Sequence, residues 1–135
     1  MQMTELLSAT GLTEKAVRLY ESKGLIQPRR AENGRRQFSA ADLVTLTFLG
    51  QARRLGFPLD DCVRLLQLRQ NENRRSAEVK AIAEQFLVKL EDKRRELDAV
   101  TEVLTDLVKK CPGDDNPHCS IIDALAQNKG LNDVQ

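Results

Sequence analysis

Apolar residues in the N-terminal third of the chain recur at helical spacing and are interrupted by glycines. Residues 4–9 form one predicted helical segment, which ends at Gly11. Thr13 is a suitable N-cap for a second helix over residues 14–22, and Gly24 is suited to follow its C-terminus. Two short helices joined by a glycine-containing turn predict a helix-turn-helix unit, an arrangement that many small helical domains share.

The pattern changes over residues 28–38, where an Asn33-Gly34 pair is flanked by arginines. Asn-Gly is the strongest short hairpin signal. We therefore predict a two-stranded wing that carries guanidinium groups on both arms. These arginines are Arg29, Arg30, Arg35 and Arg36.

Two further helices are predicted after the wing. Residues 39–42, Ser-Ala-Ala-Asp, resemble a capping box that starts a helix running to about Leu55. Residues 56–59 interrupt the pattern with a glycine and a proline, and a fourth helix begins there and ends near residues 71–73.

Residues 75–110 contain neither glycine nor proline and are predicted to form one long helix. Its apolar residues alternate in steps of four and three, interrupted only at Lys93. Such a seam is typical of a coiled coil. At ~1.5 Å per residue the helix is about 50 Å long, so we predict a homodimer, with a helix packed on its own domain as the alternative. The seam consists of Val79, Ala83, Phe86, Leu90, Leu97, Val100, Leu104 and Leu107.

Two cysteines near the C-terminus, Cys111 and Cys119, are the candidates for soft chemistry. Two prolines and a glycine between them prevent a helix and favour a loop that brings both sulfurs together. Two thiolates without further protein ligands suit a soft ion such as Cu(I). A disulfide and two unrelated thiols are the alternatives. His118 is expected to face solvent but would admit Zn(II) if it joined the site, and Cys62 is expected to be a packing or partly exposed thiol.

Charge is distributed unevenly along this chain, whose formal net charge is +1. Residues 1–56 hold nine basic and five acidic residues, residues 57–110 hold eleven of each, and residues 111–135 hold one lysine and four aspartates. A basic N-terminal part predicts a polyanionic partner for that part alone, unless the excess is ordinary surface charge.

Several function classes are disfavoured by the same sequence. Its apolar runs are far shorter than the ~18 residues of a membrane span, and no secretory signal is visible. We therefore expect a cytoplasmic protein without a membrane partner, whose thiols stay reduced. The chain has one histidine and neither an oriented base nor a cofactor loop, which argues against an enzyme.

Taken together, the motifs resemble the MerR family of bacterial transcriptional regulators. They are Gly-Leu-Thr at residues 11–13, Val-Arg-Leu-Tyr-Glu at 17–21, Gly-Leu-Ile at 24–26, Arg29 with Gly34-x-Arg36 and Phe38, and Gln-Ala-Arg-Arg-Leu-Gly-Phe at 51–57. The loop at residues 111–119, followed by Ser-Ile-Ile, resembles that of the copper-efflux regulators within this family. The resemblance covers residues 1–125.

This resemblance implies a homodimer whose winged domains each bind half of a palindromic promoter in double-stranded DNA. The promoter's spacer is too long for RNA polymerase, and metal binding makes the dimer bend and untwist it, activating copper-efflux genes. The long helices would pair as an antiparallel coiled coil. One Cu(I) per chain, or Ag(I) or Au(I), would bind Cys111 and Cys119.

Candidate DNA contacts follow from the positions that match the family's motifs. Arginine and tyrosine supply hydrogen bonds to phosphates, which set the register on the duplex. Arg18, Tyr20 and Arg36 match contacting positions, and Lys15, Arg35 and Arg53 are weaker candidates. Two departures leave the operator open: the family usually has an aromatic residue in place of Arg35 and a tyrosine in place of Phe38.

Further residues are expected around the two thiolates. The backbone N–H groups of residues 120–122, including those of Ser120 and Ile122, are expected to offset the negative charge of a two-thiolate complex. Lys80 of a partner subunit is a candidate counter-charge by analogy. Ser76 matches a position where zinc-responsive relatives carry a cysteine, which favours a monovalent ion here.

The predicted fold is thus mainly α. It comprises a winged helix-turn-helix domain (residues 1–73), a dimerisation helix (74–110), a metal-binding loop with a short helix (111–127) and a flexible tail (128–135). A cysteine-pair redox switch on the same scaffold and a zinc-type divalent sensor are the alternative functions. A metal chaperone would not need the arginine-flanked wing.

Overall fold

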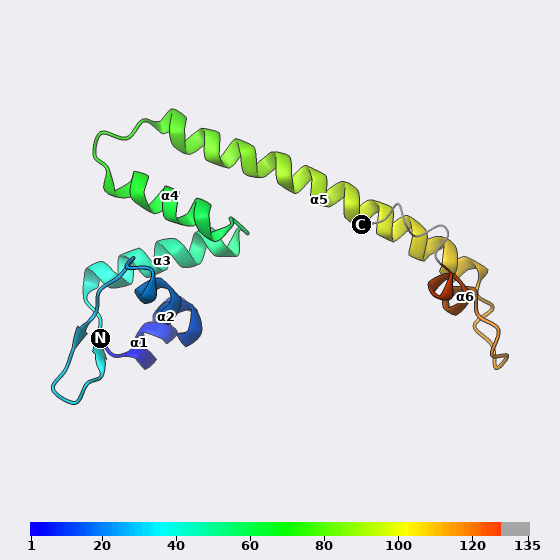
Figure 1. Ribbon diagram of the computed structural model, residues 1–135, viewed down its shortest axis with the longest axis horizontal. Coiled ribbons are helices and arrows are strands. Elements are labelled where there is room, and N and C mark those ends of the chain that lie inside the picture. The colour runs from blue at the N-terminus through cyan, green and yellow to red at the C-terminus, as the bar shows by residue number, and fades with distance from the viewer. Residues whose placement is uncertain (128–135) are drawn as a thin grey trace. The chain divides into compact units, whose positions relative to one another are not determined.

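Helices make up most of the computed structural model, which describes residues 1–127 (Figure 1). The predicted flexible tail, residues 128–135, lies outside the described residues. The chain divides into two compact units, Met1–Ile82 and a second that begins at Ala83. In chain order the elements are α1 (Met3–Thr10), α2 (Glu14–Ser22), β1 (Arg29–Arg30), β2 (Arg36–Gln37), α3 (Ala40–Arg54), α4 (Leu59–Gln70), α5 (Ser76–Lys110) and α6 (Ser120–Ala126).

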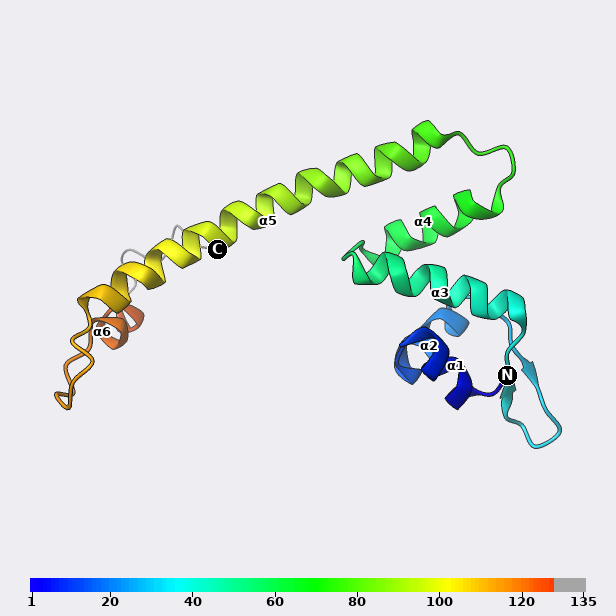
Figure 2. The same ribbon diagram turned by 180° about the vertical axis from the view of Figure 1, so that it is seen from behind.

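Helix α3 is the centre of the first unit. It contacts α1 on one side and α4 on the other, an arrangement that both views show (Figures 1 and 2). Apolar side chains from all these elements meet around it and exclude water. The buried core comprises Leu6, Val17, Tyr20, Ile26, Phe38, Leu46, Leu49, Ala52, Cys62 and Leu66.

The helix starts follow the predicted capping chemistry. The Thr13 hydroxyl accepts a hydrogen bond from the Ala16 N–H at 3.1 Å at the start of α2. At the start of α3, Ser39 and Asp42 form the reciprocal pair of a capping box. Each cap satisfies backbone N–H groups that have no partner within the helix. Both predictions are confirmed.

The predicted wing is present as an antiparallel hairpin that pairs Arg29 with Gln37 and Arg30 with Arg36. Its turn is closed by a hydrogen bond from the Gly34 N–H to the Ala31 carbonyl at 2.9 Å. Gly34 alone takes the left-handed conformation there, with φ of +80°, so the Asn-Gly pair forms a three-residue loop rather than a two-residue one.

A close approach at Gly11 fixes the turn between α1 and α2. Gly11 has φ of +72°, and a Cβ built there would lie 2.5 Å from the Arg54 guanidinium. Arg54 donates a hydrogen bond to the Thr10 carbonyl at 3.3 Å, at the end of α1. The turn therefore needs a glycine both for its backbone conformation and for the arginine that crosses it.

The first unit includes the first turns of α5, up to Ile82. Ile82 on α5 is 3% exposed and lines a hollow with Leu68 of α4 and Asn71, the residue that follows α4. The start of the long helix therefore packs with the winged unit.

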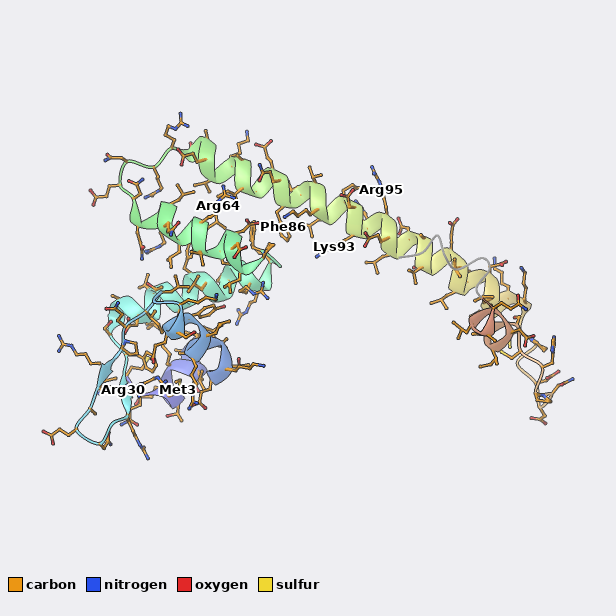
Figure 3. All side chains as sticks on the ribbon, in the orientation of Figure 1. Met3, Arg30, Arg64, Phe86, Lys93 and Arg95 are labelled. Atoms are coloured by element: carbon orange, nitrogen blue, oxygen red, sulfur yellow. The ribbon has the colours of Figure 1, made fainter. Side chains whose placement is uncertain are left out.

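In the second unit α5 continues to Lys110, in agreement with the predicted helix, and α6 follows the cysteine loop. The Ser120 hydroxyl donates a hydrogen bond to the Leu107 carbonyl at 3.1 Å, which ties α6 to the end of α5. Four of the eight seam residues, Leu90, Leu97, Val100 and Leu104, are solvent-exposed in the single chain, whereas Phe86 is buried. Lys93, which interrupts the seam, lies midway along α5 (Figure 3). None of the helices within residues 1–127 combines the length and apolarity needed to cross a membrane.

Candidate nucleic-acid interface and dithiol site

Four arginines surround a hollow of about 420 Å³ between the start of α1, helix α2 and the wing. Met3 at the start of α1 and Arg30 on the wing, both labelled in Figure 3, belong to its lining. Guanidinium groups gathered at one surface attract phosphates, so this place suits a nucleic-acid backbone. We call it the arginine hollow; its arginines are Arg18, Arg30, Arg35 and Arg36.

Three of the predicted DNA-contacting residues are exposed at the arginine hollow or next to it. Arg18 pairs with Glu14 at 2.7 Å, one turn earlier on α2, and its side chain remains 58% exposed. Lys15 and Arg35 are exposed as well. Each can meet a phosphate without breaking the packing of the core.

Arg36 is held by an ion pair within the chain. Its Nε and Nη2 atoms donate hydrogen bonds to the two carboxylate oxygens of Glu21, at 2.8 and 3.2 Å, and its side chain is only 19% exposed. Hydrogen bonding and charge from Arg36 hold the pKa of the Glu21 carboxyl below its usual range. The sequence motif therefore identified Arg36 as a residue of the hollow, but it did not predict that Arg36 pairs with Glu21.

Tyr20 and Arg53 have structural contacts that the sequence did not predict. Tyr20 belongs to the core and is 3% exposed, and burial raises the pKa of its phenol. Arg53 donates a hydrogen bond to the Phe57 carbonyl at 2.7 Å, across the turn between α3 and α4. Packing accounts for Tyr20 and turn formation for Arg53, and a DNA contact by either residue stays a prediction.

The sequence did not predict the contact between Glu21 and the arginines of the wing. Glu21 accepts hydrogen bonds from Arg36 and also lies 3.5 Å from an Nη atom of Arg30. A carboxylate next to arginines looks unfavourable for a phosphate-binding surface, so composition gave no reason to select it. Only the wing hairpin, which pairs Arg30 with Arg36, brings both guanidinium groups to it.

The dithiol site lies in the second unit, where the loop after α5 returns to α6. The Sγ atoms of Cys111 and Cys119 are 3.4 Å apart, and both cysteines are half-buried. Local hydrogen bonds order the loop: the Asp114 carboxylate accepts from the Asn116 N–H, and the Asn116 side chain accepts from the His118 N–H. The prediction that this loop brings both sulfurs together is confirmed.

Cys119 is placed to be a good thiolate. The pKa of its thiol is lowered first by a hydrogen bond from the Ile122 N–H, then by the Cys111 thiol and the Ile121 N–H. Asp123 opposes this effect through its charge. The N–H groups of Ile121 and Ile122 thus stabilise negative charge on this sulfur, while the Ser120 hydroxyl is engaged with α5. A role for the Ser120 N–H stays a prediction.

The surroundings of the two thiols limit what else could bind an ion. His118 is 73% exposed and its Nδ1 faces Asp123 at 3.7 Å, so the expectation of a solvent-facing imidazole is confirmed. Within residues 1–127 no group of three or more histidine, cysteine or acidic side chains is arranged to hold a metal ion. Cys62 is fully buried, and burial raises the pKa of its thiol, which gives it a packing role.

Other residues predicted near the thiols are exposed in the single chain. On α6 the side chains of Ile122 and Leu125 are 66% and 67% exposed. Ser76 and Lys80 are exposed in the first turns of α5, within the first unit, and their predicted role across a dimer stays a prediction.

An arginine-lined winged helix-turn-helix unit defines a class of DNA-binding proteins, and comparisons with known proteins identify the family. Residues 1–69 match the family described as MerR HTH family regulatory protein, and residues 43–107 match the family described as MerR, DNA binding. This chain belongs to the MerR family of helix-turn-helix regulatory proteins.

Full-length relatives support the same assignment. The HTH-type transcriptional regulator HmrR of Rhizobium leguminosarum bv. viciae is 40% identical over 126 residues, covering 93% of this chain and 98% of HmrR. The HTH-type transcriptional regulator CueR of Salmonella typhimurium is 41% identical over 127 residues, covering 93% and 92%.

Solved structures with the same fold include PbrR691 from Ralstonia metallidurans CH34 in complex with lead(II). It is 30% identical, with a TM-score of 0.74 and coverage of 93% of this chain and 98% of PbrR691. HiNmlR, a MerR family regulator lacking the sensor domain and bound to promoter DNA, is 20% identical with a TM-score of 0.57, covering 98% of this chain and 95% of HiNmlR. At 20% identity, the likeness to HiNmlR supports the fold of this chain and not its function.

Proposed function

We propose that this chain is a transcriptional regulator that binds double-stranded promoter DNA through its winged unit and senses a soft monovalent metal ion, Cu(I) first, at Cys111 and Cys119. The observation that carries the metal proposal is the 3.4 Å separation of the two sulfurs, with backbone N–H groups directed at Cys119. One ion can contact both sulfurs with little movement of the loop.

The donor set fits a monovalent ion better than a divalent one. Soft thiolates favour Cu(I), and Ag(I) and Au(I) share its charge and preference. Structural zinc sites have four ligands. Among the described residues, no histidine, cysteine or acidic side chain is arranged with the two cysteines as a third ligand. The bound ion would supply positive charge and would hold the loop to α6. We therefore propose one Cu(I), Ag(I) or Au(I) per chain.

The DNA-binding proposal rests on the arginine hollow and on the family. Arg18 and Arg35 offer exposed guanidinium groups, and Lys15 lies near Arg18 on α2. We propose that two chains pair through the exposed seam of α5, as an antiparallel coiled coil, so that two winged units meet a palindromic promoter. Metal binding would then tip a near-balanced DNA deformation that lets RNA polymerase engage.

Metal competition tests the sensing proposal directly. Reduced protein is titrated anaerobically with Cu(I) against a tight Cu(I) chelator, with excess Zn(II) present. We expect one Cu(I) retained per chain, and loss of this binding in Cys111→Ser and Cys119→Ser. Cys62→Ser is the matched control, because this buried thiol lies in the core rather than in the loop.

A redox switch is the second candidate, and the same 3.4 Å separation supports it, because thiols this close can form a disulfide. It predicts that neither metal is retained and that the DNA-bound state changes with an oxidant. Displacement of copper by Zn(II) would instead indicate a divalent sensor in which His118 or a residue of a second chain completes the site.

A further inference from the structure

We propose that Glu21 is a positioning residue for DNA recognition: its carboxylate fixes the wing against α2, and this sets how well the protein distinguishes its promoter from other DNA. The inference rests on the DNA-binding function proposed above. It concerns a residue that contacts arginines of the binding surface rather than DNA.

One carboxylate holds both strands of the wing. Glu21, the penultimate residue of α2, accepts hydrogen bonds from Arg36 on β2 at 2.8 and 3.2 Å. It also pairs with Arg30 on β1 at 3.5 Å. Arg30 and Arg36 are direct partners across the hairpin, so the contact clamps the hairpin at one register position.

The contact also reaches the tip of the wing. Arg30 uses its other terminal nitrogen to donate a hydrogen bond to the Gly34 carbonyl at 3.1 Å, at the end of the turn. A continuous series of polar contacts therefore runs from α2 through Arg30 to the turn. Within residues 1–127, every ion pair that joins the wing to a helix ends at Glu21.

The wing needs such an anchor because its own pairing is short. Each strand has two residues, and a two-stranded hairpin is marginally stable on its own. At its base the wing is held by the buried Phe38. Beyond that point the Glu21 carboxylate orients Arg30 and Arg36 at the arginine hollow, and with them the rest of the wing.

The proposal is testable because the charge of Glu21 and its role in positioning the wing predict different effects of its removal on DNA binding. Glu21 places a negative charge beside a surface that should attract phosphates. If only charge mattered, its removal would strengthen binding to all DNA equally. If Glu21 positions the wing, its removal lets the arginines meet any duplex but aligns them poorly with the promoter, so the preference for that promoter falls.

The experiment compares two duplexes. One is a duplex of about 40 base pairs selected by the wild-type protein from a randomised pool, long enough for two half-sites one or two helical turns apart. The other has the same composition in shuffled order. Binding is measured by fluorescence anisotropy over a series of KCl concentrations, and circular dichroism checks that each variant is folded.

Three variants separate position from charge. Glu21→Asp keeps the charge but is one methylene shorter, so we expect about a tenfold loss of preference with an unchanged salt slope. Glu21→Gln should show the same loss, with a slope steeper by about 1 because one arginine charge is freed. Glu32→Gln is the control: this exposed carboxylate of the wing loop has no ion pair within residues 1–127, and its loss should leave the preference unchanged.

The proposal is overturned if Glu21→Asp stays folded and keeps the wild-type preference, or if Glu21→Gln behaves like Glu32→Gln. If Glu21→Gln fails to fold, the charge-conserving Glu21→Asp decides alone. Failure of the wild-type protein to prefer any selected duplex would count against the DNA-binding function itself, which is a different result.

Discussion

Leucines have opposite environments in the two units of this chain. In the first unit Leu6 and Leu46 are fully buried, whereas in the second Leu97 and Leu125 are both 67% exposed. The first unit therefore encloses a core of apolar residues within one chain, although a few, such as Leu55, stay exposed. The second leaves a stripe of them in water, which a soluble protein normally covers with another surface.

The difference follows from the number of layers that each unit contains. In the first unit α3 has helices on two sides, so side chains from several elements enclose a common core. In the described part of the second unit, up to residue 127, α5 is accompanied only by the short α6 and a loop. A single long helix cannot bury an apolar stripe by itself, so we expect the second unit, unlike the first, to need a partner surface that covers the stripe.

The largest expected effect is on the core of the first unit. Leu46→Ala removes a fully buried side chain from α3, and we expect it to lower the free energy of unfolding by about 3–5 kcal/mol. Urea denaturation followed by circular dichroism measures this loss. The control Leu55→Ala, at a residue that is 70% exposed, should cost less than about 0.5 kcal/mol. Equal costs would contradict the core described here.

The second-largest expected effect is on the association of two chains, and the first unit should stay folded. The double variant Leu97→Lys and Leu104→Lys places two charges on the seam, and we expect the dimer dissociation constant to rise at least about a hundredfold. Sedimentation equilibrium measures it. Val88→Lys is the matched control, because Val88 is 64% exposed on the same helix but lies outside the seam. A dimer broken by Val88→Lys alone would place the interface elsewhere.

Sequence patterns predicted the elements of both units well, because helix caps, heptads and glycine breaks act over a few residues. The capping box at Ser39, the wing around Gly34 and the long helix from Ser76 all appear where the pattern placed them. The proximity of Cys111 and Cys119 was also predictable, since the prolines and glycine of one short loop determine it.

Long-range polar contacts were not predictable in the same way. Arg36 was selected by a motif, but its pairing with Glu21 depends on how the hairpin sits on α2. Tyr20 was selected as a DNA contact, although its helix places it in the core. Such contacts join residues that no periodicity relates, so they emerge only when the elements are packed together.

Alanine substitutions at one glycine in each unit, Gly11 and Gly113, should have effects of intermediate size on stability. Gly11→Ala strains a residue with φ of +72° and brings a Cβ within 2.5 Å of Arg54, so we expect a loss of about 2 kcal/mol in the first unit. Gly113→Ala also strains a positive φ, of +65°, but meets no atom within 4 Å and lies in the loop of the second unit. Thermal melts of both variants should show a larger fall in melting temperature for Gly11→Ala than for Gly113→Ala.

The smallest effect concerns pH and the Glu21–Arg36 pair of the first unit. Because Arg36 lowers the pKa of Glu21 in the folded chain, the unfolded chain binds that proton more tightly. The stability from this pair is therefore fully present above the ordinary pKa of a glutamate, and it is lost as pH falls through the lower pKa of the folded state. The pair is partly exposed, so we expect at most about 1 kcal/mol.

Urea denaturation of wild type and Glu21→Gln, from about pH 7 to about pH 3, isolates this contribution, because the other carboxylates titrate alike in both proteins. The stability difference should be largest near neutrality and should close in acid. Glu32→Gln should differ from wild type by much less at every pH, since Glu32 lies in no ion pair among residues 1–127. A difference for Glu21→Gln that is constant with pH would mean that packing, rather than charge, accounts for the effect of Glu21.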